Sequence, residues 1–150
     1  MQQHKCILKE YIYLINQPDG GDSIMAKIVI IDDDPDILEA STLILNSKGY
    51  DVLTANNPVD GYKLVKESNP DLIILDVMMN EPDDGFFLAQ KFRKNNIDIP
   101  IIMYTSVSKS IGLEFGVSDI VPVNDFIEKP ISPKALLEII KKHLQLQVKE

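Results

Sequence analysis

The sequence alternates short apolar runs with longer amphipathic stretches, and this alternation is the feature that most constrains its fold. The runs at residues 28–31 and 72–75 contain only Ile, Val and Leu, which indicates strands buried on both faces of a sheet. Further strands are predicted at residues 50–54, 99–104 and 126–128. Because helical stretches separate most of these strands, the pattern predicts an α/β domain with a parallel sheet and right-handed crossovers.

Local signals mark where the helices begin and end. Asp34-Pro35, Asn57-Pro58 and Ser132-Pro133 each place a capping side chain before a proline at the first helical position. Gly49 is predicted to end the first of these helices. Residues 106–124 resist assignment because glycines and β-branched residues interrupt them, so we expect an irregular or mobile segment without a long helix across 109–119.

Length and charge narrow the class of protein. The chain has 150 residues and a formal net charge of -8, from 15 Lys and Arg against 23 Asp and Glu. This length predicts one domain, and the acidity argues against direct nucleic-acid binding because phosphate contacts need a basic surface. No apolar run is long enough for a membrane span or a signal peptide, and the single Cys6 cannot form an internal disulfide. We therefore expect a cytoplasmic protein without membrane contact.

The first 24 residues differ from the rest of the chain. They hold one short apolar run and then the loop-forming segment Gln17–Asp22, after which Met25 precedes the first strand. Two interpretations stay open for residues 1–24: a flexible N-terminal arm, or upstream sequence translated from a misplaced start with Met25 as the native start. The domain is expected to span residues 25–150, with no output domain attached.

Carboxylates follow two of the predicted strands. Asp32, Asp33 and Asp34 come after the first strand, and Asp76 comes after the third. In a flavodoxin-like, doubly wound (βα)5 sheet of strand order 2-1-3-4-5 these two strands are neighbours, so Asp32, Asp33 and Asp76 are expected to converge. Three such carboxylates repel one another unless a hard cation, most simply Mg²⁺, binds them. Asp34 is interpreted as the helix cap.

Two further polar residues end the remaining strands. Thr105 follows the fourth strand and Lys129 follows the fifth. With Asp76 as a carboxylate nucleophile, the Thr105 hydroxyl and the Lys129 ammonium group could each contact a phosphoryl oxygen. A nucleophile, a cation site and a charge clamp are the groups that phosphoryl transfer requires.

Four segments that carry these residues resemble the receiver domain of bacterial two-component response regulators. They are Ile28–Pro35, Asp71–Met79, Pro100–Ser106 and Asp125–Pro130, and the similarity runs from Lys27 to about Leu146. The resemblance implies a stand-alone response regulator that accepts a phosphoryl group on Asp76 from a histidine kinase or a histidine phosphotransfer protein. It would signal by phosphorylation-dependent docking to an unknown downstream protein or by phosphorelay. It would catalyse only its own Mg²⁺-dependent phosphotransfer and dephosphorylation, and its oligomeric state stays open.

The resemblance also implies roles for the residues around Asp76. Asp33, Asp76 and the backbone carbonyl of Met78 would bind Mg²⁺ directly, and Asp32 would act through a bound water molecule. Lys129 and Thr105 would contact the phosphoryl group, with Lys129–Pro130 as a cis bond. As Thr105 moves, Phe126 would turn inward as the switch residue.

Some positions depart from the family pattern. Asn80 stands where the family usually has Pro, and the segment from Asp76 to Gly85 is about one residue longer than usual, which leaves the path of this loop open. Met78 and Val107 are apolar at the two positions that would affect phosphoryl lifetime. Because neither side chain can orient an attacking water, we predict slow dephosphorylation.

Rival interpretations remain. A metal-dependent phosphohydrolase would use Asp32 as nucleophile and Asp34 as acid, but no insertion is large enough for the usual cap over the substrate. A flavodoxin-like cofactor binder would need a phosphate-binding loop rich in Gly, Ser or Thr after the first strand. A binding module that has lost phosphorylation is the third alternative. His143, in the last helix, is interpreted as a surface or half-buried residue and not as a phosphohistidine, and His4 lies in the doubtful arm.

Overall fold

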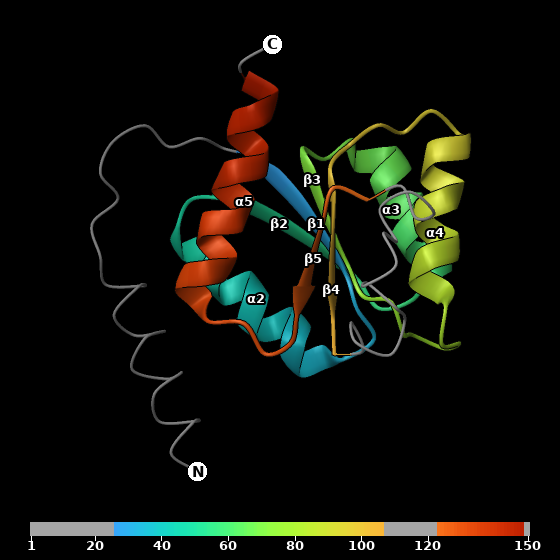
Figure 1. The fold of residues 1–150 in the computed structure, drawn as a ribbon, viewed down its shortest axis with the longest axis horizontal. Coiled ribbons are helices and arrows are strands. Elements are labelled where there is room, and N and C mark those ends of the chain that lie inside the picture. Colours follow the sequence, from blue (N-terminus) through green and yellow to red (C-terminus); the bar gives the residue numbers. More distant parts are fainter. Residues whose placement is uncertain (1–25, 107–122, 149–150) are drawn as a thin grey trace.

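The computed structural model describes residues 26–106 and 123–148, in which five strands form one parallel sheet. The strand order is β2-β1-β3-β4-β5, as expected from the sequence (Figure 1). The strands are β1 (Lys27–Ile31), β2 (Asp51–Ala55), β3 (Leu72–Leu75), β4 (Ile101–Thr105) and β5 (Asp125–Glu128). The helices are α2 (Pro35–Ser47), α3 (Pro58–Ser68), α4 (Asp84–Lys94) and α5 (Pro133–Val148).

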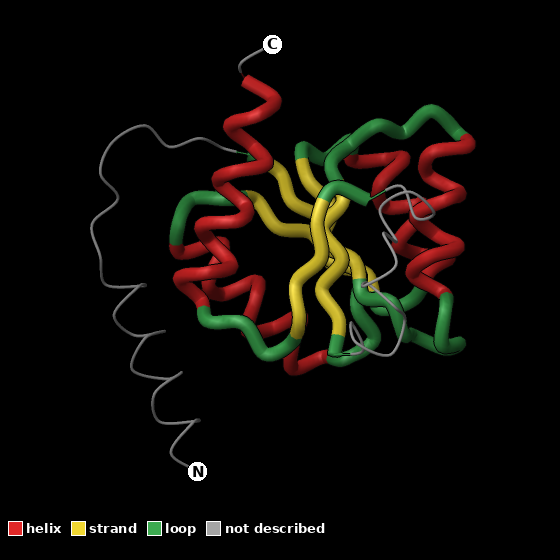
Figure 2. The backbone as a smooth tube through the Cα atoms, in the orientation of Figure 1, coloured by secondary structure: helices red, strands yellow, loops and turns green. Residues whose placement is uncertain are grey.

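Helices cover both faces of the sheet, as Figure 2 shows in the same orientation. On one face, α3 and α4 pack Val65, Leu88 and Phe92 against the strands. On the other face, α2 and α5 contribute residues such as Leu45 and Ile140 to a second apolar layer. Because both faces are covered, the residues of β3 are all buried, which explains its uninterrupted apolar sequence. The predicted doubly wound α/β fold is confirmed.

The predicted capping residues begin three of the helices. Asp34 accepts a hydrogen bond from the Asp36 backbone N–H, and Asn57 does the same for Asp60 at 2.8 Å. The Ser132 hydroxyl accepts from the Ala135 N–H at 3.1 Å, just before α5. Gly49 follows α2 with a φ of +87°, a conformation that favours glycine at this position. The sequence signals for these termini are therefore confirmed.

β4 begins two residues later than the apolar pattern predicts. The Arg93 guanidinium of α4 donates hydrogen bonds to the carbonyls of Ile97 and Ile99, at 2.6 and 2.9 Å. Sheet pairing of this segment starts at Ile101, opposite Ile73, and the Pro100 carbonyl before it accepts from the Ile73 N–H at 2.9 Å. Apolar composition alone does not distinguish a strand from an apolar segment whose carbonyls bind a side chain.

The interpretation of His143 as a surface or half-buried residue is wrong. His143 is only 7% exposed, and its Nε2 lies 2.9 Å from Oδ2 of Asp125 in β5. It follows Leu136 and Ile140 at helical spacing, so it lies on the inward face of α5. A polar ring is tolerated there because the Asp125 carboxylate pairs with it.

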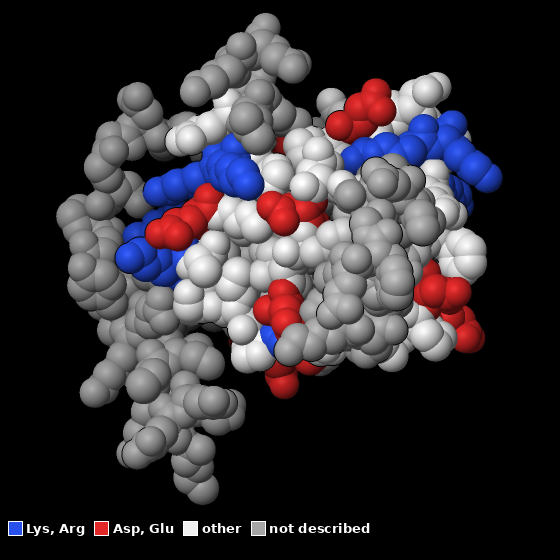
Figure 3. All heavy atoms as spheres, viewed as in Figure 1, with Lys and Arg blue, Asp and Glu red and all other residues white. Residues whose placement is uncertain are grey.

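Charges on α4 follow the direction of the helix. Asp84 lies in its first turn, and Lys91, Arg93 and Lys94 lie in its last turn, which matches the helix dipole. Figure 3 shows basic side chains over the upper part of α4 and acidic ones over its lower part. The first turn of α4 lies at the carboxyl end of the sheet, beside the candidate site.

Several expectations fall outside the described residues. These are the two interpretations of residues 1–24, the irregular conformation of residues 107–122, and the role of Val107 in phosphoryl lifetime. The same holds for the side chain of Thr105. Across the described helices, none has both the length and the apolar composition to cross a membrane.

Candidate functional site

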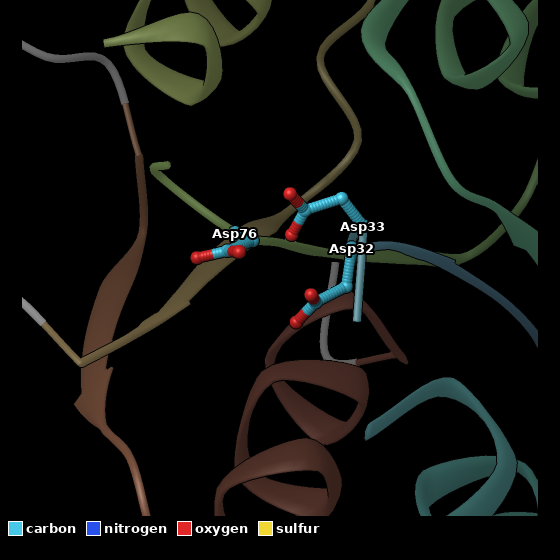
Figure 4. Close-up of side chains that lie close together, drawn as sticks. All are labelled: Asp32, Asp33 and Asp76. Carbon is cyan, nitrogen blue, oxygen red and sulfur yellow. The ribbon is translucent and has the colours of Figure 1, made fainter. Parts of the chain in front are cut away.

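Three carboxylates meet at the carboxyl end of the sheet. β1 and β3 are parallel neighbours with Ile31 opposite Leu75, so the next residues, Asp32 and Asp76, also lie side by side. One oxygen from each of Asp32, Asp33 and Asp76 lies within 4.8 Å of the others. Figure 4 shows the three side chains gathered at the strand ends. The convergence predicted from strand order is confirmed.

The two buried carboxylates are held by the backbone around them. The Asp76 N–H donates to the Ile31 carbonyl at 2.9 Å, which extends the β1–β3 ladder to the end of the strand. Asp32 Oδ1 accepts from the Asp34 N–H at 2.9 Å, and its other oxygen, Oδ2, accepts from Lys129. Asp32 and Asp76 are only 2% and 6% exposed, whereas Asp33 is exposed at the rim. The cluster is thus two fixed buried carboxylates and one accessible carboxylate.

Lys129 brings the positive charge to this cluster. Its Nζ lies 2.6 Å from Asp32 Oδ2 and 3.6 Å from Asp76 Oδ2. The residue comes directly after β5, and its bond to Pro130 is cis, as the resemblance implies. One ammonium group therefore bridges the two buried carboxylates, with the shorter contact to Asp32.

Electrostatics at the site favour a proton or a cation. Burial, and after it the nearby Asp32 charge, raise the pKa of Asp76 to about 7, while Lys129 opposes both effects. Burial lowers the pKa of Lys129, but its hydrogen bond to Asp32 and the two carboxylate charges raise it overall. Within the described residues, three carboxylates face one ammonium group, so this part of the site has an excess of negative charge. Hard oxygen ligands with uncompensated charge fit a divalent cation such as Mg²⁺.

The loop after Asp76 is fixed by Gly85. The Gly85 N–H donates to the Val77 carbonyl at 2.8 Å, and a Cβ at this glycine would overlap the Asp76 carbonyl oxygen. Only a residue without a side chain allows the start of α4 to approach Asp76 this closely.

The loop between Asp76 and Gly85, predicted to be longer than usual, is closed by a hydrogen bond in which the Asp84 carboxylate accepts from the Glu81 N–H. Asn80, at the position where the family usually has Pro, is exposed. Met78 is 41% exposed beside the pocket.

The remaining predicted site residues lie near the cluster to differing degrees. Thr105 ends β4 next to Glu128 of β5, so its backbone lies at the same end of the sheet. Phe126, in β5, is half-buried and packs against the apolar layer under α3 and α4. Asp34 points to the N-terminus of α2 as its cap, which confirms its interpretation as a structural residue. The predicted roles of Thr105, Phe126 and the Met78 carbonyl stay predictions.

Tyr104 is a site neighbour that the sequence reasoning did not single out. Its ring lies below Lys129, with the Nζ 5.3 Å from the ring centroid. The available signal was an aromatic residue in the otherwise aliphatic strand Ile101–Thr105, one position before Thr105. The contact depends on how the chain turns after β5, which residue spacing does not specify.

Comparison with known proteins matches this geometry to one family. Residues 28–141 match the family model described as "Response regulator receiver domain". A CheY-like receiver domain protein from Methanospirillum hungatei JF-1 superposes with a TM-score of 0.75 at 31% identity, covering 83% of this chain and 98% of that one. The BeF3-activated N-terminal receiver domain of Klebsiella pneumoniae RstA superposes with a TM-score of 0.70 at 27% identity, covering 79% and 97%.

A curated relative is longer than this chain. The probable transcriptional regulator ycf27 of Porphyridium aerugineum is 38% identical over 114 residues. The match covers 73% of this chain but only 44% of that protein. The similarity therefore concerns the receiver domain, and the activity of the longer protein does not transfer with it.

Proposed function

This chain belongs to the response regulator receiver domain family, and from that premise we propose that Asp76 is its phosphoacceptor. The observation that carries the proposal is the position of Asp76 in the cluster: it is buried, it ends a central strand, and the only ammonium group described there lies 3.6 Å away. Nucleophilic carboxylates of this kind form aspartyl phosphates.

In the proposed reaction, an Asp76 carboxylate oxygen attacks phosphorus in line with the bond to the donor. With a phosphohistidine donor, the new O–P bond forms as the N–P bond breaks, and the imidazole leaves with the electron pair and takes up a proton. The donor is a histidine kinase or a histidine phosphotransfer protein. Lys129, already beside both buried carboxylates, stabilises the charge on the transferring group. Thr105 contacts another phosphoryl oxygen.

The donor set at the site fits Mg²⁺. Asp33, Asp76 and the Met78 carbonyl would hold the ion, and Asp32 would act through a bound water molecule. When bound, the ion would supply positive charge against the phosphoryl oxygens. Without the ion, the contact between Asp32 and Lys129 pairs one of the carboxylates with a positive charge. This contact limits the repulsion within the cluster.

We propose that the phosphorylated domain signals by docking to a protein partner or by passing the phosphoryl group on, with Phe126 turning inward as the switch. Because histidine kinases use ATP, we place this exchange in the cytoplasm. The exposed, apolar Met78 cannot orient an attacking water, so the phosphorylated state should persist well beyond seconds. A Met78→Asn variant, with an amide beside the phosphoryl group, should lose it several-fold faster in a decay measurement of the purified phosphoprotein.

The phosphohydrolase alternative is less compatible with the geometry. That mechanism needs a free acid at Asp34, but Asp34 Oδ1 accepts the hydrogen bond that caps α2. Turnover of generic phosphate esters that depends on Asp32 would favour this alternative.

Phosphorylation by a small-molecule phosphodonor tests the proposal. The protein is incubated with phosphoramidate and Mg²⁺, and its intact mass is measured. We expect the mass of one added phosphoryl group, lost in Asp76→Asn and retained in Asp71→Asn, a matched substitution at the opposite end of β3. Labelling that persists in Asp76→Asn would overturn the proposal.

A further inference from the structure

Tyr104 lies beneath the turn that carries Lys129. It is 7% exposed and belongs to the apolar layer between the sheet and helices α2 and α5. In the sheet it stands opposite Ile127 of β5, two residues before Lys129. The ring is therefore fixed by the core and does not depend on the site for its position.

Two contacts join Tyr104 to this turn. The Lys129 Nζ lies 5.3 Å from the ring centroid, within the range of a cation–π interaction. The hydroxyl at the far end of the ring is hydrogen-bonded to the backbone of Ile131. Ile131 also packs against the same apolar layer. One buried side chain thus holds the lysine and the backbone two residues after it.

A lysine at this position benefits from such support. Its flexible side chain has several rotatable bonds and loses much rotamer freedom when fixed. Lys129 is largely buried, with 14% of its side chain exposed, and its ammonium group lies near both the Tyr104 ring and the carboxylates of Asp32 and Asp76. The ring therefore adds a second attraction, besides that of the carboxylates, that holds the ammonium group at this place.

We propose that Tyr104 is a positioning residue for phosphotransfer: its ring holds the Lys129 ammonium group toward Asp76, and its hydroxyl fixes the following turn. This proposal rests on the proposed role of Asp76 and Lys129. It assigns to Tyr104 an effect that acts through Lys129 alone, without contact with the phosphoryl group.

A double-mutant comparison tests the proposal. Tyr104→Leu should lower the rate of phosphorylation by phosphoramidate about tenfold, because the ring contact is lost. In a Lys129→Ala background, the same substitution should cause no further loss, since there is no ammonium group left to position. A reduction by the same factor in both backgrounds would show a general structural effect and overturn the proposal.

Tyr50 provides a matched control. It is 8% exposed, lies in the same apolar layer, and precedes β2 at the opposite end of the sheet. Tyr50→Leu should lower thermal stability to a similar degree but leave the phosphorylation rate within about twofold of wild type. If Tyr104→Leu also phosphorylates at the wild-type rate, the proposal is wrong.

Ring variants keep the test decisive if Tyr104→Leu does not fold. Tyr104→Phe retains the ring face and should phosphorylate within about threefold of wild type. A trifluorophenylalanine at position 104 has nearly the same shape but a weakened ring quadrupole, and it should be several-fold slower than Phe. Equal rates for the two rings would contradict the cation–π role.

Asp76→Asn, measured in parallel, separates the two proposals. Labelling that persists in Asp76→Asn contradicts the proposed function itself. Labelling that is lost in Asp76→Asn but unaffected by changes at Tyr104 contradicts only the role of Tyr104.

Discussion

At the carboxyl end of the sheet, three clustered carboxylates have one described ammonium group, that of Lys129, which contacts Asp32 and Asp76. At the amino end, several charged groups instead have partners of their own. There, the Asp71 carboxylate accepts from the Lys27 backbone N–H at 2.8 Å. Asp125 pairs with His143 of α5 at 2.9 Å. Arg93 donates to two carbonyls and to Asn124.

This difference indicates that charged groups at the amino end serve the stability of the fold, whereas those at the carboxyl end serve ligand binding. Partnered groups at the amino end join strands to helices and gain nothing from a ligand. Uncompensated carboxylates at the carboxyl end oppose folding until a cation or a proton neutralises them, and this leaves them available for ligands. We expect substitutions at the two ends to affect different measurements.

The largest effect is expected at Gly85, at the carboxyl end of the sheet, where there is no space for a side chain beside Asp76. Gly85→Ala would place a Cβ against the Asp76 carbonyl, so it should cost about 3 kcal/mol or more of unfolding free energy and slow phosphorylation. Gly61→Ala is the comparison, because its nearest contacts would be with the buried Ile31 side chain and not with backbone, so it should cost about 1–2 kcal/mol, less than Gly85→Ala. Urea denaturation measures both. Equal losses would show that the approach of α4 to Asp76 is not the constraint.

Arg93 tests whether the two ends are independent. Arg93→Met removes donors to the Ile97 and Ile99 carbonyls and should cost about 2–3 kcal/mol of stability. Phosphorylation of the folded protein should stay within about twofold of wild type. Arg93→Lys should restore only part of the stability, because a point charge cannot replace the planar fork of donors. A tenfold change in phosphorylation would show coupling between the ends.

The raised pKa of Asp76 predicts a pH dependence of stability without divalent cations. The folded state, in which the Asp76 pKa is about 7, binds this proton more tightly than the unfolded state, with a pKa near 3.8. This stabilisation is fully present below the unfolded pKa and is lost as pH rises through about 7. Lowering the pH from 8 to 5.5 should thus add about 2 kcal/mol relative to Asp76→Asn.

Denaturant titrations of both proteins at the two pH values measure this difference. Mg²⁺ should reduce it, since the ion competes with the proton for the same oxygens. Identical pH dependence in wild type and Asp76→Asn would contradict the excess of negative charge at this end.

The smallest effects contrast two neighbouring aspartates. Asp34→Ala removes the α2 cap and should cost about 1 kcal/mol of stability, with Mg²⁺ affinity within about threefold of wild type. Asp33→Asn should instead lower Mg²⁺ affinity at least about tenfold and change stability by less than about 0.5 kcal/mol. Calorimetric Mg²⁺ titration and denaturant unfolding distinguish these effects. If Asp34→Ala lowered Mg²⁺ affinity and Asp33→Asn did not, the metal ligand would be Asp34 and not Asp33.

Much of the fold and of the acidic cluster could be predicted from the sequence. β3, and β1 after Lys27, are apolar because helices cover both faces, and parallel neighbours bring Asp32 and Asp76 together at their ends. The helix caps could also be predicted from the sequence, because a capping side chain interacts only with the next few residues. These features depend on local chemistry and on one topological rule.

Other features depend on contacts between distant residues. The shorter contact of Lys129 to Asp32 than to Asp76 depends on where the chain turns after β5. The support of Lys129 by Tyr104 depends on the same turn. The burial of His143 could be predicted from its helical spacing from Leu136 and Ile140. However, a polar ring is stable at this buried position only because it pairs with Asp125, 18 residues away in the sequence. Spacing along one element does not identify partners on another.

Chemical trapping of the phosphorylated residue tests the central claim most directly. After phosphorylation with Mg²⁺, borohydride reduces an aspartyl phosphate to homoserine, and peptide mass spectrometry locates the modified position. We predict homoserine at position 76 alone. Homoserine at position 32 or 33, or its absence from a protein that has gained a phosphoryl group, would contradict the assignment of Asp76 as the phosphoacceptor.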